Sequence, residues 1–163
     1  TLALALGDAL AVALLEEKGF RREDFARFHP GGSLGRKLLL RVRDVMVTDP
    51  LPILAAGATM REAIVQLADR RGLVMIAAPD HRLLGVITTG DLTRLMEQEQ
   101  DIFPIPVERA MTRSPKSIHA TELGSAAVHL METKGIVALP VLDDDERITG
   151  VVHLHDLMRA GAV

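Results

Sequence analysis

Apolar and polar residues follow one another in two arrangements that each occur twice along this chain. Apolar side chains first recur at spacings of three and four positions, which predicts an amphipathic helix at each place. Two short apolar runs follow each of these segments, and such runs bounded by polar residues predict buried strands. The helical positions are Met60, Ala63, Ile64, Leu67 and Ala68, then Leu123, Ala126, Ala127, Leu130 and Met131; the strands are 73–77 and 83–87, then 136–142 and 148–152.

A longer motif indicates that these arrangements belong to an internal repeat. Residues 85–92 read GVITTGDL and residues 150–157 read GVVHLHDL, so the two copies start 65 residues apart. Each copy predicts a strand that turns directly into a helix, with an acid in the first helical turn, where the helix dipole favours negative charge. Met46 and Met111 are separated by the same spacing. Each repeat is therefore expected to contain a helix, two strands and a second helix.

The two repeats are expected to form a pseudo-twofold pair, because one repeat of about 55 residues buries too little apolar surface to be stable alone. The strand-to-helix junctions should then face a shared cleft, and free N–H groups at a helix start attract phosphate. Asp91 can accept ribose hydroxyls there, and the Thr88 hydroxyl can reach a phosphate oxygen. Both residue types also cap helices without any ligand. The residues alone leave a nucleotide site and a simple helix cap both open.

The doubled motif resembles that of tandem cystathionine-β-synthase (CBS) domains, and the similarity covers residues 41–163. The resemblance implies an α/β fold built from two CBS repeats, at residues 41–100 and 101–163. It also implies a regulatory module that binds an adenine nucleotide or a related ligand between the repeats.

The two copies match the CBS motif to different degrees. Thr88 and Asp91 fit the pattern fully, whereas the second copy keeps Asp156 but has His153 where threonine or serine is usual. A histidine there could donate to a phosphate or fill the pocket with its ring. The ligand-binding residues that the resemblance implies are Thr88, Asp91, His153 and Asp156.

Residues 1–40 are interpreted as the end of an upstream domain together with its linker. Residues 1–20 are apolar nearly all round, which predicts a helix that is buried. This segment is too short to predict a membrane span, and it carries Asp8 inside it. We therefore expect the chain to be the C-terminal portion of a longer protein, with the packing partners of this helix in the preceding part.

Residues 28–40 (FHPGGSLGRKLLL) resemble the junction in D-arabinose 5-phosphate isomerases, which join a sugar-isomerase (SIS) domain to a CBS pair. Residues 153–161 also resemble that family. The resemblance implies a parent enzyme that interconverts D-ribulose 5-phosphate and D-arabinose 5-phosphate and so feeds synthesis of the lipopolysaccharide sugar Kdo. The absence of cysteine agrees with a cytoplasmic setting. The resemblance further implies that His29 contributes to catalysis in the context of the upstream SIS domain, so this chain alone is expected to be inactive.

Two roles for the CBS pair follow from this resemblance. In the first, the cleft binds an effector that is a nucleotide or nucleotide sugar, such as CMP-Kdo or AMP. In the second, the pair is a ligand-free oligomerisation module, in which the helices at 92–97 and 157–160 pack against another copy in a homodimer or homotetramer. An autonomous enzyme is not expected, because the sequence offers no organised base, nucleophile or metal set.

Composition narrows the remaining classes of function. Charged residues make up 25% of the chain and the net charge is −3, so neither nucleic acid nor a membrane is an expected partner. The chain has no tryptophan or tyrosine on which bases could stack, and no cysteine for disulfides or thiol chemistry. His153 and His155 are two positions apart at a helix start and do not face each other, so neither a metal site nor a cofactor is expected.

Overall fold

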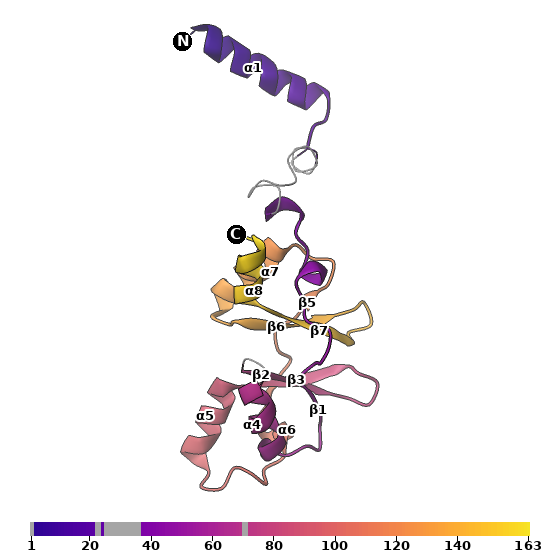
Figure 1. Cartoon of the computed structure of the whole chain (residues 1–163), viewed down its shortest axis with the longest axis vertical. Helices are drawn as coiled ribbons and strands as arrows, with labels where there is room; N and C mark the ends of the chain where they lie inside the picture. Colours follow the sequence, from indigo (N-terminus) through magenta and orange to yellow (C-terminus); the bar gives the residue numbers. More distant parts are fainter. Residues whose placement is uncertain (1, 22–23, 25–36, 70–71) are drawn as a thin grey trace.

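The chain forms two stacked units whose sheets face each other and whose helices cover the outer faces (Figure 1). The computed structural model describes residues 2–21, 24, 37–69 and 72–163. Two sheets with helices on one face of each make the mixed α/β repeat pair that the doubled pattern predicts.

The first unit contains a four-stranded sheet with the strand order β1-β2-β3-β4. Strand β2 pairs parallel with β1 and antiparallel with β3, and β4 extends the sheet beyond β3. The helix and the two strands predicted from the apolar pattern all form. The elements are β1 (Ile53–Ala55), α4 (Met60–Asp69), β2 (Leu73–Ala77), β3 (Leu83–Thr88), α5 (Thr89–Gln98), α6 (Val107–Ala110) and β4 (Thr112–Arg113).

The second unit repeats this plan with a three-stranded sheet in the order β5-β6-β7. Strand β6 again lies between a parallel and an antiparallel neighbour, as β2 does in the first unit. Helix α7 ends at Gly135, which adopts a left-handed conformation that glycine reaches without strain. The elements are η1 (Val42–Asp44), β5 (Ile118–His119), α7 (Gly124–Lys134), β6 (Ala138–Leu142), β7 (Ile148–His153) and α8 (Leu154–Ala160).

The segment that precedes each repeat in the sequence packs into the core of the unit formed by the other repeat. The first lead-in segment, residues 40–47, packs with the second unit: Val42 is fully buried in that core, and Val47 pairs with Val151 of β7. The second lead-in segment, residues 102–113, belongs to the core of the first unit. Because the segments cross over, neither unit can be removed without exposing the core of the other.

Close backbone approach explains the repeated glycine and methionine of the sequence. A Cβ atom on Gly85 would lie 2.8 Å from the Sδ atom of Met111, and one on Gly150 would lie 3.0 Å from that of Met46. Each methionine therefore lies against the bare backbone of the central hairpin of the unit into which its lead-in segment packs. The two methionines, which share the repeat spacing, thus anchor the lead-in segments in the two cores.

A third cluster of buried apolar side chains joins the two sheets where they face each other. It fills the space between units with aliphatic residues, which agrees with the scarcity of aromatic residues in the sequence. Its buried members are Leu73, Met75, Ala77 and Val86 from the first unit, and Ala138, Leu142, Ile148 and Val151 from the second.

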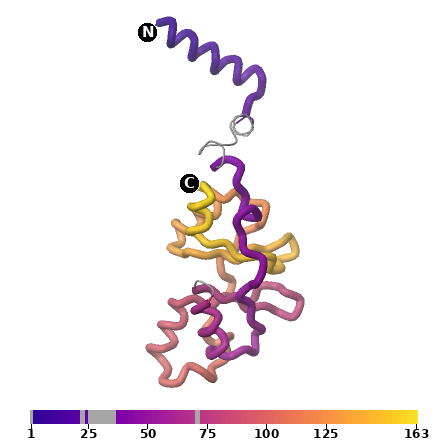
Figure 2. The backbone as a smooth tube through the Cα atoms, in the orientation of Figure 1, coloured from indigo at the N-terminus to yellow at the C-terminus, as the bar shows by residue number. Residues whose placement is uncertain are grey.

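The N-terminal apolar segment forms helix α1 (Leu2–Glu17), which lies apart from the two units (Figure 2). None of its residues is buried by the described chain, so the burial expected against a preceding part of the protein stays a prediction. None of the helices within the described residues is long and apolar enough to cross a membrane. His29, the predicted catalytic residue, lies outside the residues that the structure describes.

Candidate functional site

The first strand-to-helix junction is fixed by a reciprocal helix cap. Thr88 is the N-cap of α5, and its Oγ1 accepts from the backbone N–H of Asp91 at 3.4 Å. In return, the Asp91 carboxylate accepts from the Thr88 N–H at 2.8 Å and from the Thr88 hydroxyl at 2.7 Å. This is a capping box, which ends one strand and begins one helix within four residues.

Asp91 is buried behind this cap and is held by two further donors. Its side chain accepts from the hydroxyl of Thr112 at 3.0 Å and from the guanidinium of Arg94. The residue is only 4% exposed. A carboxylate offers about four acceptor positions, and here each oxygen has two donors. A ribose hydroxyl could reach this carboxylate only if one of these donors gave way.

The hydroxyl proton of Thr88 is already donated to Asp91, so this hydroxyl cannot also donate to a ligand. The Thr88 hydroxyl donates to Asp91 and accepts from the Asp91 N–H, so a remaining lone pair is left for a further donor. Thr88 therefore suits a ligand hydroxyl. The N–H groups of Thr89 and Gly90, in the first turn of α5, have no partner within the helix and suit an anion.

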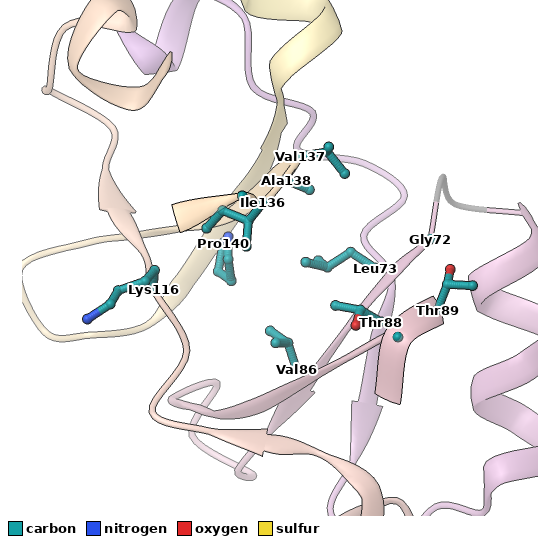
Figure 3. Close-up of a pocket in the computed structure, with 12 residues that line it drawn as sticks. Gly72, Leu73, Val86, Thr88, Thr89, Lys116, Ile136, Val137, Ala138 and Pro140 are labelled. Carbon is teal, nitrogen blue, oxygen red and sulfur yellow. The ribbon is translucent and has the colours of Figure 1, made fainter. Parts of the chain in front are cut away.

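These groups lie on the wall of a cavity of about 380 Å³ between the two units (Figure 3). The volume is within the range of small-molecule sites. Lys116 contributes its carbon chain to the wall, while its ammonium group points away from Thr88. The first unit contributes Gly72, Leu73, Val86, Thr88, Thr89 and Gly90, and the second contributes Gly135, Ile136, Val137, Ala138 and Pro140.

The cavity combines an aliphatic wall with polar groups at one end. Leu73 and Val86 lie opposite Pro140 and its neighbours across the cavity, with Thr88 beside Val86 (Figure 3). An aliphatic slot can hold a flat ring, and the start of α5 can hold an anionic group attached to it. The arrangement supplies binding groups, and the described lining contains no organised base and nucleophile.

The second junction has the same backbone path and different chemistry. His153 precedes α8 without capping it through its side chain, and its Nδ1 lies 3.9 Å from the Asp156 carboxylate. His153 is nearly buried, and Arg159 lies 3.0 Å from the His155 ring. Near it is a cavity of about 400 Å³ whose described lining comes from the second unit alone: Val137, His153, Leu154, His155 and Met158. Among the described residues, the predicted shared cleft is therefore seen at the first junction.

The structure brings together Thr88 and Asp91, and separately His153 and Asp156, as the spacing predicts. It adds Arg94, Thr112 and Lys116, which sequence reasoning missed. Arg94 is three residues after Asp91 on one helix, so its contact could have been found from spacing. Thr112 and Lys116 come from the other repeat, and no local pattern indicates them. Among the described residues there is no cluster of three or more possible metal ligands.

The chain is similar along its whole length to arabinose 5-phosphate isomerases. It is 43% identical over 166 residues to arabinose 5-phosphate isomerase KdsD of Pseudomonas aeruginosa, covering all of this chain and 51% of the relative. The enzyme of the same name from Yersinia pestis is 43% identical over 165 residues, covering all of this chain and 50% of the relative. The chain thus spans about half the length of these curated relatives.

Solved structures of CBS pairs have the same fold. The CBS domain pair of protein MJ0100, solved with 5′-methylthioadenosine and S-adenosyl-L-methionine, matches with a TM-score of 0.65 and 25% identity over 73% of this chain and 93% of that one. The AMP complex of CBS domain protein PAE2072 from Pyrobaculum aerophilum matches with a TM-score of 0.64 and 26% identity over 72% and 89%. The CBS domain family matches residues 42–98 and 107–163, and the chain belongs to that family.

Proposed function

We propose that this chain is the regulatory part of an arabinose 5-phosphate isomerase. Its similarity to enzymes of that name extends over the whole chain but only half of each relative, which leaves room for a catalytic SIS domain upstream. The complete cytoplasmic enzyme would interconvert D-ribulose 5-phosphate and D-arabinose 5-phosphate and supply Kdo for lipopolysaccharide. His29 would contribute to catalysis beside that domain, and this chain alone would be inactive.

The ligand of the module is a nucleotide or nucleotide sugar, such as AMP or CMP-Kdo. The observation that carries this proposal is the cavity between the units, where an aliphatic slot ends at the start of α5. The N–H groups of Thr89 and Gly90 would hold the phosphate, and Thr88 would accept a sugar hydroxyl. Asp91 would fix Thr88, with His153 and Asp156 as the candidate ligand residues of the second junction. Adenosine ligands in two related CBS structures support this class.

Regulation would follow from linkage between the cavity and the arrangement of the two units. A ligand that contacts both walls prefers one arrangement, and such preferences typically contribute about 1–3 kcal/mol of coupling. The first lead-in segment carries the connection to residues 1–40, because it is built into the core of the second unit.

A ligand-free oligomerisation role is the second candidate, and exposed methionines favour it. Met96 on α5 is 61% exposed and Met158 on α8 is 53% exposed. Apolar residues on the helices after each motif could pack against another copy in a homodimer or homotetramer. In this case the thermal stability of the chain would depend on protein concentration and would not respond to nucleotides.

The two candidates are separated by thermal unfolding in the presence of AMP, ATP, CMP, CMP-Kdo or arabinose 5-phosphate. A ligand at about 100 times its dissociation constant adds roughly 2.7 kcal/mol, which raises the Tm by about 5–11 °C. The proposal expects a selective rise with at least one nucleotide. The oligomerisation role would instead be established by two results together: no rise of Tm with any of these ligands, and a Tm that increases with protein concentration.

Gly90 provides a variant that tests the position of the anion without disturbing the fold. A Cβ atom there meets nothing closer than 3.6 Å, and an acid in the first turn suits the helix dipole. Gly90→Asp should therefore fold normally and lose the nucleotide-induced rise, because its carboxylate repels a phosphate. Gly90→Asn has the same size without the charge and should keep the rise. Equal rises in both variants would refute phosphate binding at this junction.

A further inference from the structure

Thr112 contacts the binding junction without lining the cavity. It lies on β4, opposite Val86 of β3, and its hydroxyl donates to Asp91 at 3.0 Å. Four residues later in the chain, Lys116 reaches the cavity wall. The chain thus contacts the first junction at Thr112, in the second lead-in segment, and reaches the cavity wall at Lys116.

The second unit shows that the fold does not need this hydroxyl. Val47 occupies the counterpart position, because it pairs with Val151 of β7 as Thr112 pairs with Val86 of β3. Valine has the shape of threonine but no donor for an acid. The same strand pairing is therefore built once with the hydroxyl and once without it.

The arginine that follows each motif also contacts different partners in the two units. Arg94 pairs with Asp91 in the first unit, whereas its counterpart Arg159 lies 3.0 Å from His155 in the second. The hydroxyl and the guanidinium therefore both hold the acid of the first junction. Both residues are exposed, but Arg94 reaches the carboxylate with a long flexible side chain, whereas Thr112 does so with a short side chain on a paired strand. Thr112 is the better restraint on the orientation of the carboxylate.

We propose that Thr112 is a positioning residue for ligand binding at the first junction, a proposal that rests on the proposed function. It fixes one oxygen of Asp91, the other oxygen fixes the Thr88 hydroxyl, and the lone pair of Thr88 is thereby aimed into the cavity. Preorganised hydrogen-bonding groups bind more tightly because less order has to be gained on binding. The described residues therefore present a prepared site at the first junction.

The test compares AMP binding by calorimetry in the unsubstituted chain and in Thr112→Val, Thr112→Ser and Thr149→Val. Thr112→Val gives the first unit the valine of the second and should weaken AMP binding roughly tenfold, within the range for directly coupled groups. Thr112→Ser keeps the hydroxyl and should restore most of the affinity. Thr149 is the matched control, because its hydroxyl donates to the carbonyl of Val141 and neither residue lines the cavity. Thr149→Val should leave affinity unchanged.

The melting temperature separates positioning from a structural role. The proposal expects both Thr112→Val and Thr149→Val to lower the Tm, because each loses a hydrogen bond, whereas only Thr112→Val loses affinity for AMP. Equal affinity in Thr112→Val and the unsubstituted chain, or a weakened Thr112→Ser that matches Thr112→Val, would overturn the role of Thr112 alone. If the unsubstituted chain binds none of the nucleotides in the panel, the proposed function and this inference fall together.

Discussion

Asp91 is expected to contribute more to the stability of the fold than an ordinary surface acid. Its carboxylate receives two hydrogen bonds from Thr88, one from Thr112 and an ion pair from Arg94, and the residue is nearly buried. Asp91→Ala removes all four acceptor contacts at once. It leaves the donors of Thr88 and Thr112 beside a void.

The loss can be estimated from the separate contacts. Removal of a helix cap typically costs about 1 kcal/mol, and a hydrogen bond to a buried charged group contributes about 1.5–3 kcal/mol. The pair with Arg94 adds little, because the guanidinium is mostly exposed and can return to water. The expected total is about 3 kcal/mol, which lowers the Tm by about 6–12 °C in a chain of this size.

Thermal and urea unfolding of Asp91→Ala measure this loss directly. Asp144→Ala is the control, since the Asp144 side chain is fully exposed in a turn and its removal should change stability by less than about 0.5 kcal/mol. A Tm for Asp91→Ala equal to that of the control would refute the view that Asp91 is a structural acceptor. That result would instead indicate that the Asp91 carboxylate serves ligand binding and not the stability of the fold.

Three other changes have defined outcomes. Gly85→Ala places a Cβ atom 2.8 Å from Met111 and should destabilise the chain by about 1–3 kcal/mol in urea unfolding. The Thr59 N–H and hydroxyl donate to the Glu62 carboxylate and lower its pKa from the ordinary value of 4.5. The ionised carboxylate therefore stabilises the fold above pH 4.5, and this stabilisation is lost as the pH falls through the lowered pKa. Glu62→Gln should weaken the resulting decrease of Tm in acid. Leu139→Ala, in the core of the second unit, should cost about 2–5 kcal/mol, measured by urea unfolding.

The longer elements could be predicted from sequence because their own side chains carry the pattern. Helix α4 needs an apolar face, and at its start the Glu62 carboxylate accepts from the N–H and the hydroxyl of Thr59. Strands β2 and β6 are buried along their whole length and read as continuous apolar runs. By contrast, β1, β4 and β5 have only two or three residues, so their pairing is decided by the neighbouring strand.

The site could be predicted only in part, for a similar reason. The cap of Thr88 and Asp91 is local, and spacing within one helix turn indicates it. The contact from Thr112 depends on the crossing of the lead-in segments, which no window of neighbouring residues reveals. The burial of α1 stays a prediction, because an apolar helix indicates only that a packing partner is needed, and the described chain does not supply it.

The crossed lead-in segments also determine how a ligand effect can leave the module. A ligand in the first cavity contacts both units, so it favours one position of β2 and β3 relative to β6. The backbone of residues 40–47 follows the second unit, because Leu40 accepts from the Gly124 N–H at 2.7 Å and Met46 packs on Gly150. Any shift of the second unit is therefore passed first to Leu40, the point where the chain leaves the pair toward its N-terminus. The first repeat follows the N-terminal segment directly in the sequence. In the structure, however, that segment is connected through contacts to the second unit first.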